Sequence, residues 1–212
     1  MRPLATVSIF ALLAAAPALA QTGTGNPATM APGTAQSAPG MPAPNQPNQN
    51  DRLFVYELTI GGNAEAAFGQ LAEQKGGFPA IRDFGHQMAA DHSKANQQLM
   101  QLAKAANLPQ TGEPDEEHKA MRSQLDQLRG ADFDLAYIRG QVADHQKTAQ
   151  LLEWEIGSGQ DPQLKAFASE ILPVVLRHLQ MAENIESQLT ATASAPNPPR
   201  GAPTPGARPA PR

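Results

Sequence analysis

The feature that most constrains the fold is a helical period of apolar residues that runs through nearly all of residues 51–190. In the last part of this region, for example, apolar side chains recur every three or four positions from Leu164 and Phe167 to Ile185. That spacing is the period of an amphipathic α-helix with one buried face. No segment alternates polar and apolar residues with a period of two, as a half-buried strand would. The sequence therefore predicts an all-α domain at residues 51–190.

Glycine and proline residues divide this domain into helices. Four long helices are expected at 51–75, 79–107, 132–157 and 162–189, and a short one at 115–128. Two of the three connections between long helices are short, which favours antiparallel neighbours. We therefore expect an antiparallel four-helix bundle with a short extra helix between its second and third long helices. Pro173 removes one backbone donor from the fourth helix, which predicts a kink there.

The two ends of the chain have compositions unlike that of the domain. Residues 1–20 combine Arg2, an apolar run and Ala18-Leu19-Ala20, which is the pattern of a cleaved signal peptide. We therefore expect an exported protein in the periplasm or associated with the outer membrane, with no membrane span after signal cleavage. Residues 21–50 are rich in Pro, Ala and Gly, and residues 191–212 are rich in Pro and Arg. Such segments cannot bury enough apolar surface to fold, so a disordered linker and a disordered tail are expected.

Composition excludes several classes of function. The chain has no cysteine, which rules out disulfides and thiolate metal ligands. Residues 51–186 carry twelve basic and twenty acidic side chains, a net charge of −8 that argues against nucleic-acid binding. The sequence has no Gly-x-Ser-x-Gly elbow, no P-loop and no paired Glu-x-x-His motifs of a di-iron bundle. We therefore expect a non-catalytic protein with no catalytic residues and no organic cofactor, and an envelope protein as partner.

Three of the five histidines fall on the apolar stripes of three different long helices. These are His92, His145 and His178, each near the middle of its helix, whereas His86 and His118 are expected to face solvent. A buried neutral imidazole needs a partner for one donor and one acceptor. The sequence therefore predicts a histidine layer at mid-height in the bundle.

This layer has two interpretations from different classes. The leading one is a structural or pH-responsive layer, because polar core layers are commoner than metal sites. If the rings are buried and neutral, their pKa values are lowered, and stability should fall as the pH drops below about 6.5. The alternative is a transition-metal site that serves in sequestration, sensing or delivery.

In the metal interpretation, Glu65 of the first helix is the expected carboxylate ligand beside the three histidines. Asp91 and Asp144 are expected to support metal-binding histidines on neighbouring helices by hydrogen bonding. The predicted heights of His145 and His178 differ by about 7.5 Å, at about 1.5 Å of rise per residue. The spacing therefore allows a three-histidine site without requiring one.

The segments AEAAFGQLAEQKG, FGHQMAADH, FDLAYIRGQVADHQKTAQLLE and LKAFASEILPVVLRHLQMAE resemble the bacterial family called domain of unknown function 4142. The resemblance covers about residues 51–189 and implies a ferritin-like fold and a periplasmic or outer-membrane location. The recurring polar positions that it implies are Glu65, Asp91, His92, His145 and His178. The family has no assigned activity, so the resemblance implies a fold and a compartment but no function.

Overall fold

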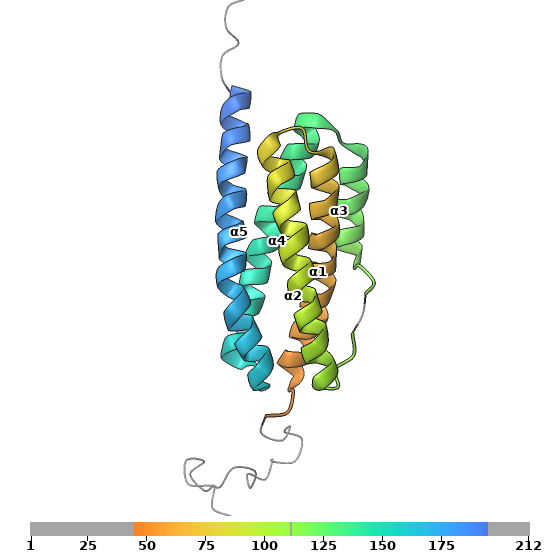
Figure 1. The fold of residues 1–212 in the computed structure, drawn as a ribbon, viewed down its shortest axis with the longest axis vertical. Coiled ribbons are helices and arrows are strands. Elements are labelled where there is room, and N and C mark those ends of the chain that lie inside the picture. Colours follow the sequence, from red (N-terminus) through yellow and green to blue (C-terminus); the bar gives the residue numbers. More distant parts are fainter. Residues whose placement is uncertain (1–44, 111, 195–212) are drawn as a thin grey trace, which may run out of the picture. The chain divides into compact units, whose positions relative to one another are not determined.

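The computed structural model describes residues 45–110 and 112–194; the expected signal peptide, most of the linker and residues 195–212 of the tail lie outside these ranges. The described residues form five α-helices and no strand, which confirms the all-α prediction (Figure 1). The helices are α1 (Gln49–Lys75), α2 (Pro79–Ala105), α3 (Glu116–Gln127), α4 (Gly130–Ser158) and α5 (Pro162–Ser194). The chain starts α1 two residues earlier than expected and continues α5 five residues further.

The four long helices form an antiparallel bundle, and α3 lies on its outside (Figure 1). α1 packs mainly against α2, and α4 mainly against α5; contacts of α1 with α4 and of α2 with α5 complete the ring. α3 has only a small contact area with α1 and α4. The short helix is therefore an attachment to the bundle, whereas the four long helices make its core.

Buried carboxylates fix the two ends of the bundle. Asn48 caps α1, and Asp51 in the first turn is fully buried. The Asp51 carboxylate accepts hydrogen bonds from the backbone N–H groups of Gln160 (3.0 Å) and Asp161 (2.9 Å), in the loop between α4 and α5. Asp134 makes the equivalent contact at the other end, where it accepts from two backbone N–H groups of the α1–α2 turn. These acidic side chains are therefore structural, because they satisfy backbone donors that the loops leave free.

Asp51 also corrects the inner face predicted for the start of α1. The apolar period predicts that Leu53 shares the buried face of Ile60 and Phe68. Leu53 is instead 42% exposed, whereas Phe54 and Val55 are fully buried. Asp51, Phe54 and Val55 stand at i, i+3 and i+4, the spacing of one helix face. The hydrogen bonds of Asp51 to the α4–α5 loop hold this face inward, and they leave Leu53 outside.

Two apolar clusters fill the bundle, one at each end. The cluster at the α1–α2 turn contains Phe68, Ile81, Phe84, Met88, Leu125, Phe133, Tyr137 and Ile138 among others. The cluster at the α4–α5 loop contains Phe54, Val55, Leu99, Leu152, Leu164, Phe167 and Val175 among others. Along α2, α4 and α5 a histidine separates the residues of the two clusters, so the histidines form a polar layer between two apolar halves of the core.

α1 and α2 approach each other closely at Gly69 and Gly85. A Cβ atom added to Gly69 would lie 2.6 Å from the carbonyl oxygen of Gly85, and one added to Gly85 would lie 2.7 Å from the carbonyl oxygen of Gly69. Only glycine leaves room for the two backbones at this distance.

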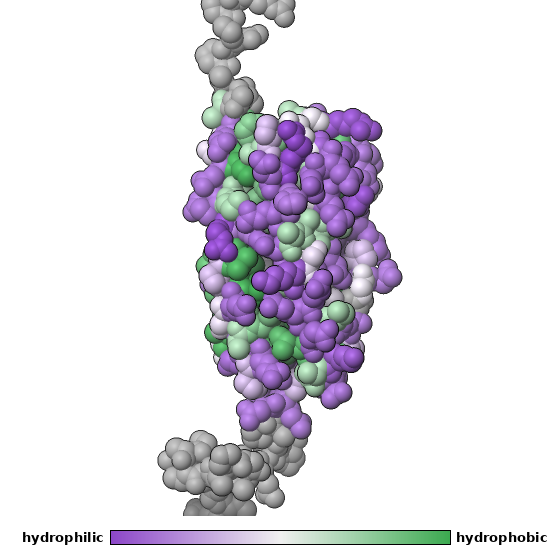
Figure 2. Space-filling model, viewed as in Figure 1, coloured by the Kyte–Doolittle hydropathy of each residue, from purple (hydrophilic) through white to green (hydrophobic). Residues whose placement is uncertain are grey.

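The visible face of the domain is mostly hydrophilic, and its hydrophobic residues form small separate patches (Figure 2). The large apolar side chains that are exposed are Leu53, Tyr56, Met100, Trp154 and Leu176. None of the described helices combines the length and the apolar composition that crossing a bilayer requires.

Candidate metal centre

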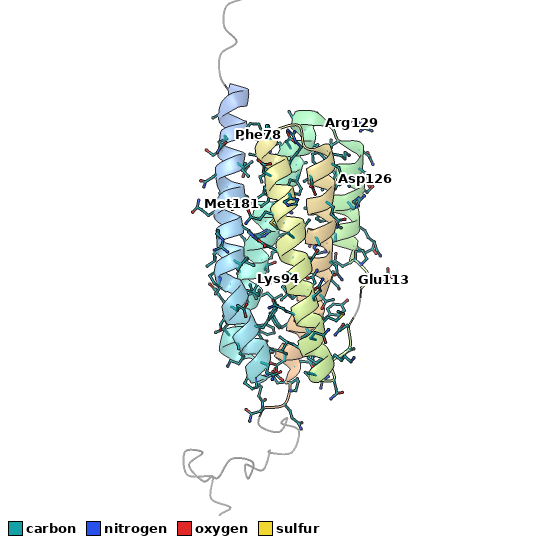
Figure 3. All side chains as sticks on the ribbon, in the orientation of Figure 1. Phe78, Lys94, Glu113, Asp126, Arg129 and Met181 are labelled. Carbon is teal, nitrogen blue, oxygen red and sulfur yellow. The ribbon has the colours of Figure 1, made fainter. Side chains whose placement is uncertain are left out.

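The rings of His92, His145 and His178 meet in the middle of the bundle. Their centroids are 5.6 Å apart for His92 and His145, 5.8 Å for His92 and His178, and 5.6 Å for His145 and His178. One nitrogen of each ring lies within 4.8 Å of the corresponding nitrogens of the other two. α2, α4 and α5 therefore each contribute one imidazole to a compact cluster. Figure 3 draws the side chains of the described residues on the ribbon.

The direction of helical side chains explains why His145 and His178 reach the same height. His145 lies 13 residues before Ser158, the end of α4, and His178 lies 16 residues after Pro162, the start of α5. The remaining offset of three residues is about 4.5 Å along the axis. Side chains on a helix tilt toward its N-terminus. In this antiparallel pair the tilt moves the His145 ring away from the α4–α5 loop and the His178 ring toward it, which reduces the offset.

Hydrogen bonds determine which ring nitrogen of two histidines is free. The Nδ1–H of His145 donates to the backbone carbonyl oxygen of Gln141 (2.8 Å), because a carbonyl can only accept. The Nε2–H of His178 donates to the Asp91 carboxylate (2.9 Å). The other nitrogens, Nε2 of His145 and Nδ1 of His178, are buried and have no hydrogen-bond partner among the described residues.

The third ring, that of His92, also has a buried nitrogen without a partner. His92 as a whole residue keeps some exposure, but its Nε2 is buried and also has no partner among the described residues. Three unpartnered ring nitrogens are thus enclosed at one place. Buried polar atoms are nearly always hydrogen-bonded in folded proteins, so three exceptions on adjoining rings require an explanation.

Burial keeps these rings neutral. It lowers the pKa of His145 to about 4 and that of His92 well below its usual value of 6.5, and the positive charge that the neighbouring rings would carry adds to both effects. Burial also lowers the pKa of His178, and the Asp91 carboxylate opposes part of that shift. Neutral imidazole is the form that binds metal ions, so protons do not compete for these nitrogens at neutral pH.

The spacing of the three rings fits one metal ion. A point equidistant from the three centroids lies about 3.3 Å from each, and an imidazole that binds an ion through nitrogen at about 2.0–2.1 Å places its centroid about 3.2 Å from that ion. The nitrogens lie within 4.8 Å of one another, so the rings must turn toward a common point to reach the separation of about 3.3 Å around a tetrahedral ion. The residues present therefore fit a single ion.

Of the carboxylates predicted for this site, Asp91 is the one that contacts a core histidine. It lies on α2 and its carboxylate accepts from His178 on the neighbouring helix α5. This is the contact between adjacent helices that the sequence predicts for it. A carboxylate on the far nitrogen of an imidazole fixes the ring orientation and makes the near nitrogen a stronger ligand.

Glu65 is buried beside the cluster and does not belong to it. It is not among the side chains whose ligand atoms lie within 4.8 Å of one another. The Glu65 carboxylate accepts from the side-chain amide of Gln141 (2.6 Å), whose backbone carbonyl in turn holds His145. Burial, with the nearby charge of Asp144, raises the pKa of Glu65 to about 8. Glu65 is thus connected to the cluster through one residue.

Asp144 lies with Glu65, and its bonding groups are on the outer side of the bundle. Its carboxylate lies 3.7 Å from the ammonium group of Lys147. Burial raises the pKa of Asp144, and the positive charges of His118 and Lys147 oppose that shift. A pocket of about 230 Å³ opens beside these residues, with Glu65, Asp144, Glu117 and His118 in its wall.

Two residues of this region were not anticipated correctly from the sequence. His118 was expected to face solvent, but only 14% of its side chain is accessible, because it donates to Asp115 and packs near the Phe68 ring. His86 is exposed as expected, with 72% of its side chain accessible. Gln141, which links His145 to Glu65, was not singled out at all. Its position one turn before a core histidine was the available signal, because a ring Nδ1 can reach the carbonyl four residues earlier in a helix.

The fold and the cluster define the class of this protein as an antiparallel four-helix bundle with a buried three-histidine layer. The chain belongs to the family described as domain of unknown function (DUF4142), which matches residues 36–185, more than two thirds of its length. No match was found among curated proteins.

One solved structure is similar to the chain. It is the crystal structure of a DUF305 fragment from Deinococcus radiodurans, with a TM-score of 0.61 and 11% sequence identity over 68% of this chain and 99% of that chain. At that identity the similarity concerns the fold alone.

Proposed function

We propose that this bundle is a transition-metal-binding protein without catalytic activity, and that His92, His145 and His178 are the ligands. The observation that carries the proposal is the enclosure of three unpartnered ring nitrogens on three adjoining histidine rings. The roles open to such a site are sequestration, sensing or delivery of the ion.

This arrangement favours metal binding over a purely structural layer. In a structural layer, each ring would donate to or accept from a neighbour, because an unsatisfied buried polar atom costs about 1–3 kcal/mol. His145 and His178 instead use one nitrogen each for a hydrogen bond, and the other nitrogen of each ring is buried without a partner. An ion that accepts all three lone pairs removes this cost and gains three bonds.

The ligand set selects the class of ion. Imidazole nitrogen suits zinc, copper, nickel and iron, whereas calcium and magnesium prefer oxygen. Three histidines leave a fourth position for water or another small ligand in a tetrahedral site. The Asp91 carboxylate on His178 supplies negative charge that stabilises a buried cation.

Two further features agree with this role. The acidic pocket with Glu65, Asp144 and Glu117 in its wall lies beside the cluster and attracts cations from solution. The amino-terminal 20 residues have the signal-peptide pattern, so we propose that the protein meets its ion in the periplasm or at the outer membrane. An envelope protein is the proposed partner for transfer of the ion.

Metal analysis of the purified protein tests the proposal. Metal-free protein is titrated with Zn²⁺, Cu²⁺, Ni²⁺ and Co²⁺, and binding is followed by calorimetry and, for Co²⁺, by the visible bands of tetrahedral coordination. Protein purified from the envelope fraction of its own cells is also analysed for bound elements. We expect one ion per chain in both preparations.

The variants are His92→Ala, His145→Ala and, as a matched control, His86→Ala, because His86 is exposed and distant from the cluster. The two core variants should lose the bound ion, and the control should retain it. Circular dichroism checks that each variant is folded. A metal content far below one ion per chain in every wild-type sample would reject the metal site and leave the structural layer. Equal metal binding by the core variants and the control would do the same.

A further inference from the structure

The two sides of the histidine layer differ in how tightly they are packed. On the side of the α1–α2 turn, the edge of the Phe84 ring lies against His178, with centroids 6.4 Å apart, and Met88 is fully buried one turn before His92. Gln141 fills the corresponding position on α4. These side chains therefore occupy the space next to the rings on that side.

On the side of the α4–α5 loop there is a small cavity that is partly open to the surface. Its volume is about 40 Å³, and the rings of His92 and His178 form one end of it. Apolar side chains from α1, α2 and α5 form most of the remaining wall, among them Leu58, Leu99, Phe167 and Val175. A fourth ligand of an ion held by the three histidines therefore enters from this cavity.

The size and polarity of the cavity limit what it can hold. A water molecule needs about 10–15 Å³ by the same kind of measure, so 40 Å³ accepts about two or three non-hydrogen atoms. The mostly apolar wall favours a small apolar molecule over an ion. The polar side chains at the wall, besides the histidines, are Asp91 and Thr148. Asp91 is already bonded to His178, and Thr148 lies one turn after His145 on α4.

We propose that the cavity makes the fourth position of the metal site a binding site for a small uncharged diatomic molecule, of the size of dioxygen, nitric oxide or carbon monoxide. This inference rests on the proposed metal site. An ionic ligand such as chloride is disfavoured because the wall offers it few donors and burial removes its hydration. The hydroxyl of Thr148 is the group in the wall that can donate to the outer atom of a bound diatomic molecule.

Carbon monoxide is the probe. The metal-free chain is loaded anaerobically with Cu⁺, its copper content is measured, and carbon monoxide is added while the C–O stretching band is recorded by infrared spectroscopy. The ¹³C isotope identifies the band. We expect one copper per chain and a single band that saturates at one carbon monoxide per copper.

Two substitutions on α2 separate the cavity from the metal site. Ala95→Val adds two carbon atoms to the cavity wall, whereas Ala90→Val makes the same change at an exposed position of the same helix. Both variants should keep one copper per chain. Ala95→Val should bind carbon monoxide at least tenfold more weakly, and Ala90→Val should bind it as the wild type does.

The outcomes distinguish this inference from the function on which it rests. One copper per chain with no C–O band, or with a band and affinity unchanged by Ala95→Val, overturns the diatomic site and leaves the metal site intact. No copper in the wild type overturns both. Xenon added to metal-free protein provides a separate measurement of the cavity: methyl resonances of Val174 and Val175 should shift, and unchanged resonances would show that the cavity admits no apolar guest.

Discussion

The burial of His145 predicts a specific effect of pH on stability. Its pKa is about 4 in the folded protein, against 6.5 when the side chain is free. Between these two values the unfolded chain binds a proton that the folded protein does not, so stability is lost as the pH falls from about 6.5 toward 4. From pH 7.5 to pH 5 the loss covers about 1.5 pH units, and at about 1.36 kcal/mol per unit it amounts to about 2 kcal/mol for this residue alone.

Two buried acids produce the opposite trend in the wild-type protein. Burial raises the pKa values of Glu65 and Glu155 to about 8, against 4.5 when they are free, with Asp144 and Asp51 as the respective neighbours that add to the shift. Between these pH values the folded protein keeps protons that the unfolded chain releases. The contribution of these two acids to the stability of the folded protein is therefore lost as the pH rises from about 4.5 to 8. The histidines and the acids therefore oppose each other, and stability should be greatest near the middle of this range. A wild-type melting curve alone does not isolate the histidines.

The comparison with His145→Asn does isolate them. Asn keeps a donor near the position of Nδ1 and does not titrate, so the acid contributions cancel when the two unfolding free energies are subtracted. Urea unfolding of metal-free protein in the presence of chelator, followed by the fluorescence of the single tryptophan, Trp154, gives both free energies. The stability advantage of the wild type over His145→Asn should be about 2 kcal/mol smaller at pH 5 than at pH 7.5.

A control and a clear refutation are available. His86→Asn, at an exposed position, should show a difference from wild type that changes little with pH. If the difference for His145→Asn also stays constant between pH 7.5 and pH 5, the ring is accessible to protons in the folded protein, and the reasoning from burial is wrong.

Two other changes test separate parts of the structure. Asp91→Asn should lower the affinity for the metal about 10–100-fold, because it weakens the hydrogen bond that orients His178. Asp83→Asn, on the exposed side of the same helix, should leave the affinity unchanged. Competition with a chelator measures both affinities, and equal values would show that Asp91 does not support the site. Gly69→Ala should destabilise the bundle by about 1–3 kcal/mol, because its Cβ meets the α2 backbone. Gly61→Ala, with open space around it, should stabilise the bundle by up to about 1 kcal/mol. Thermal or urea unfolding measures both, and a change in unfolding free energy of the same sign for the two variants would contradict the close packing of α1 and α2.

The sequence by itself determined the helical class, the four long helices and the helices on which the histidines lie. These follow from local patterns: the apolar period sets the helix faces, and proline, glycine and aspartate set the ends. The inward direction of the three core histidines was predictable for the same reason, since each interrupts an apolar stripe. The outward orientation of Leu53 was not, because the hydrogen bonds of Asp51 to the distant α4–α5 loop decide it.

The tertiary structure alone decided that the three rings meet and that Glu65 is connected to them only through Gln141. The relative heights of side chains on neighbouring helices depend on loop lengths and on the tilt of side chains toward each N-terminus. Counting residues therefore left an uncertainty in the axial positions of the histidines that was larger than the distance between ligands of one metal ion. Which nitrogens are free depends on hydrogen bonds to Gln141 and to Asp91, and Asp91 lies on a different helix from the ring that it holds. A periodic pattern specifies the face of one helix, whereas a site built from three helices exists only once they have packed.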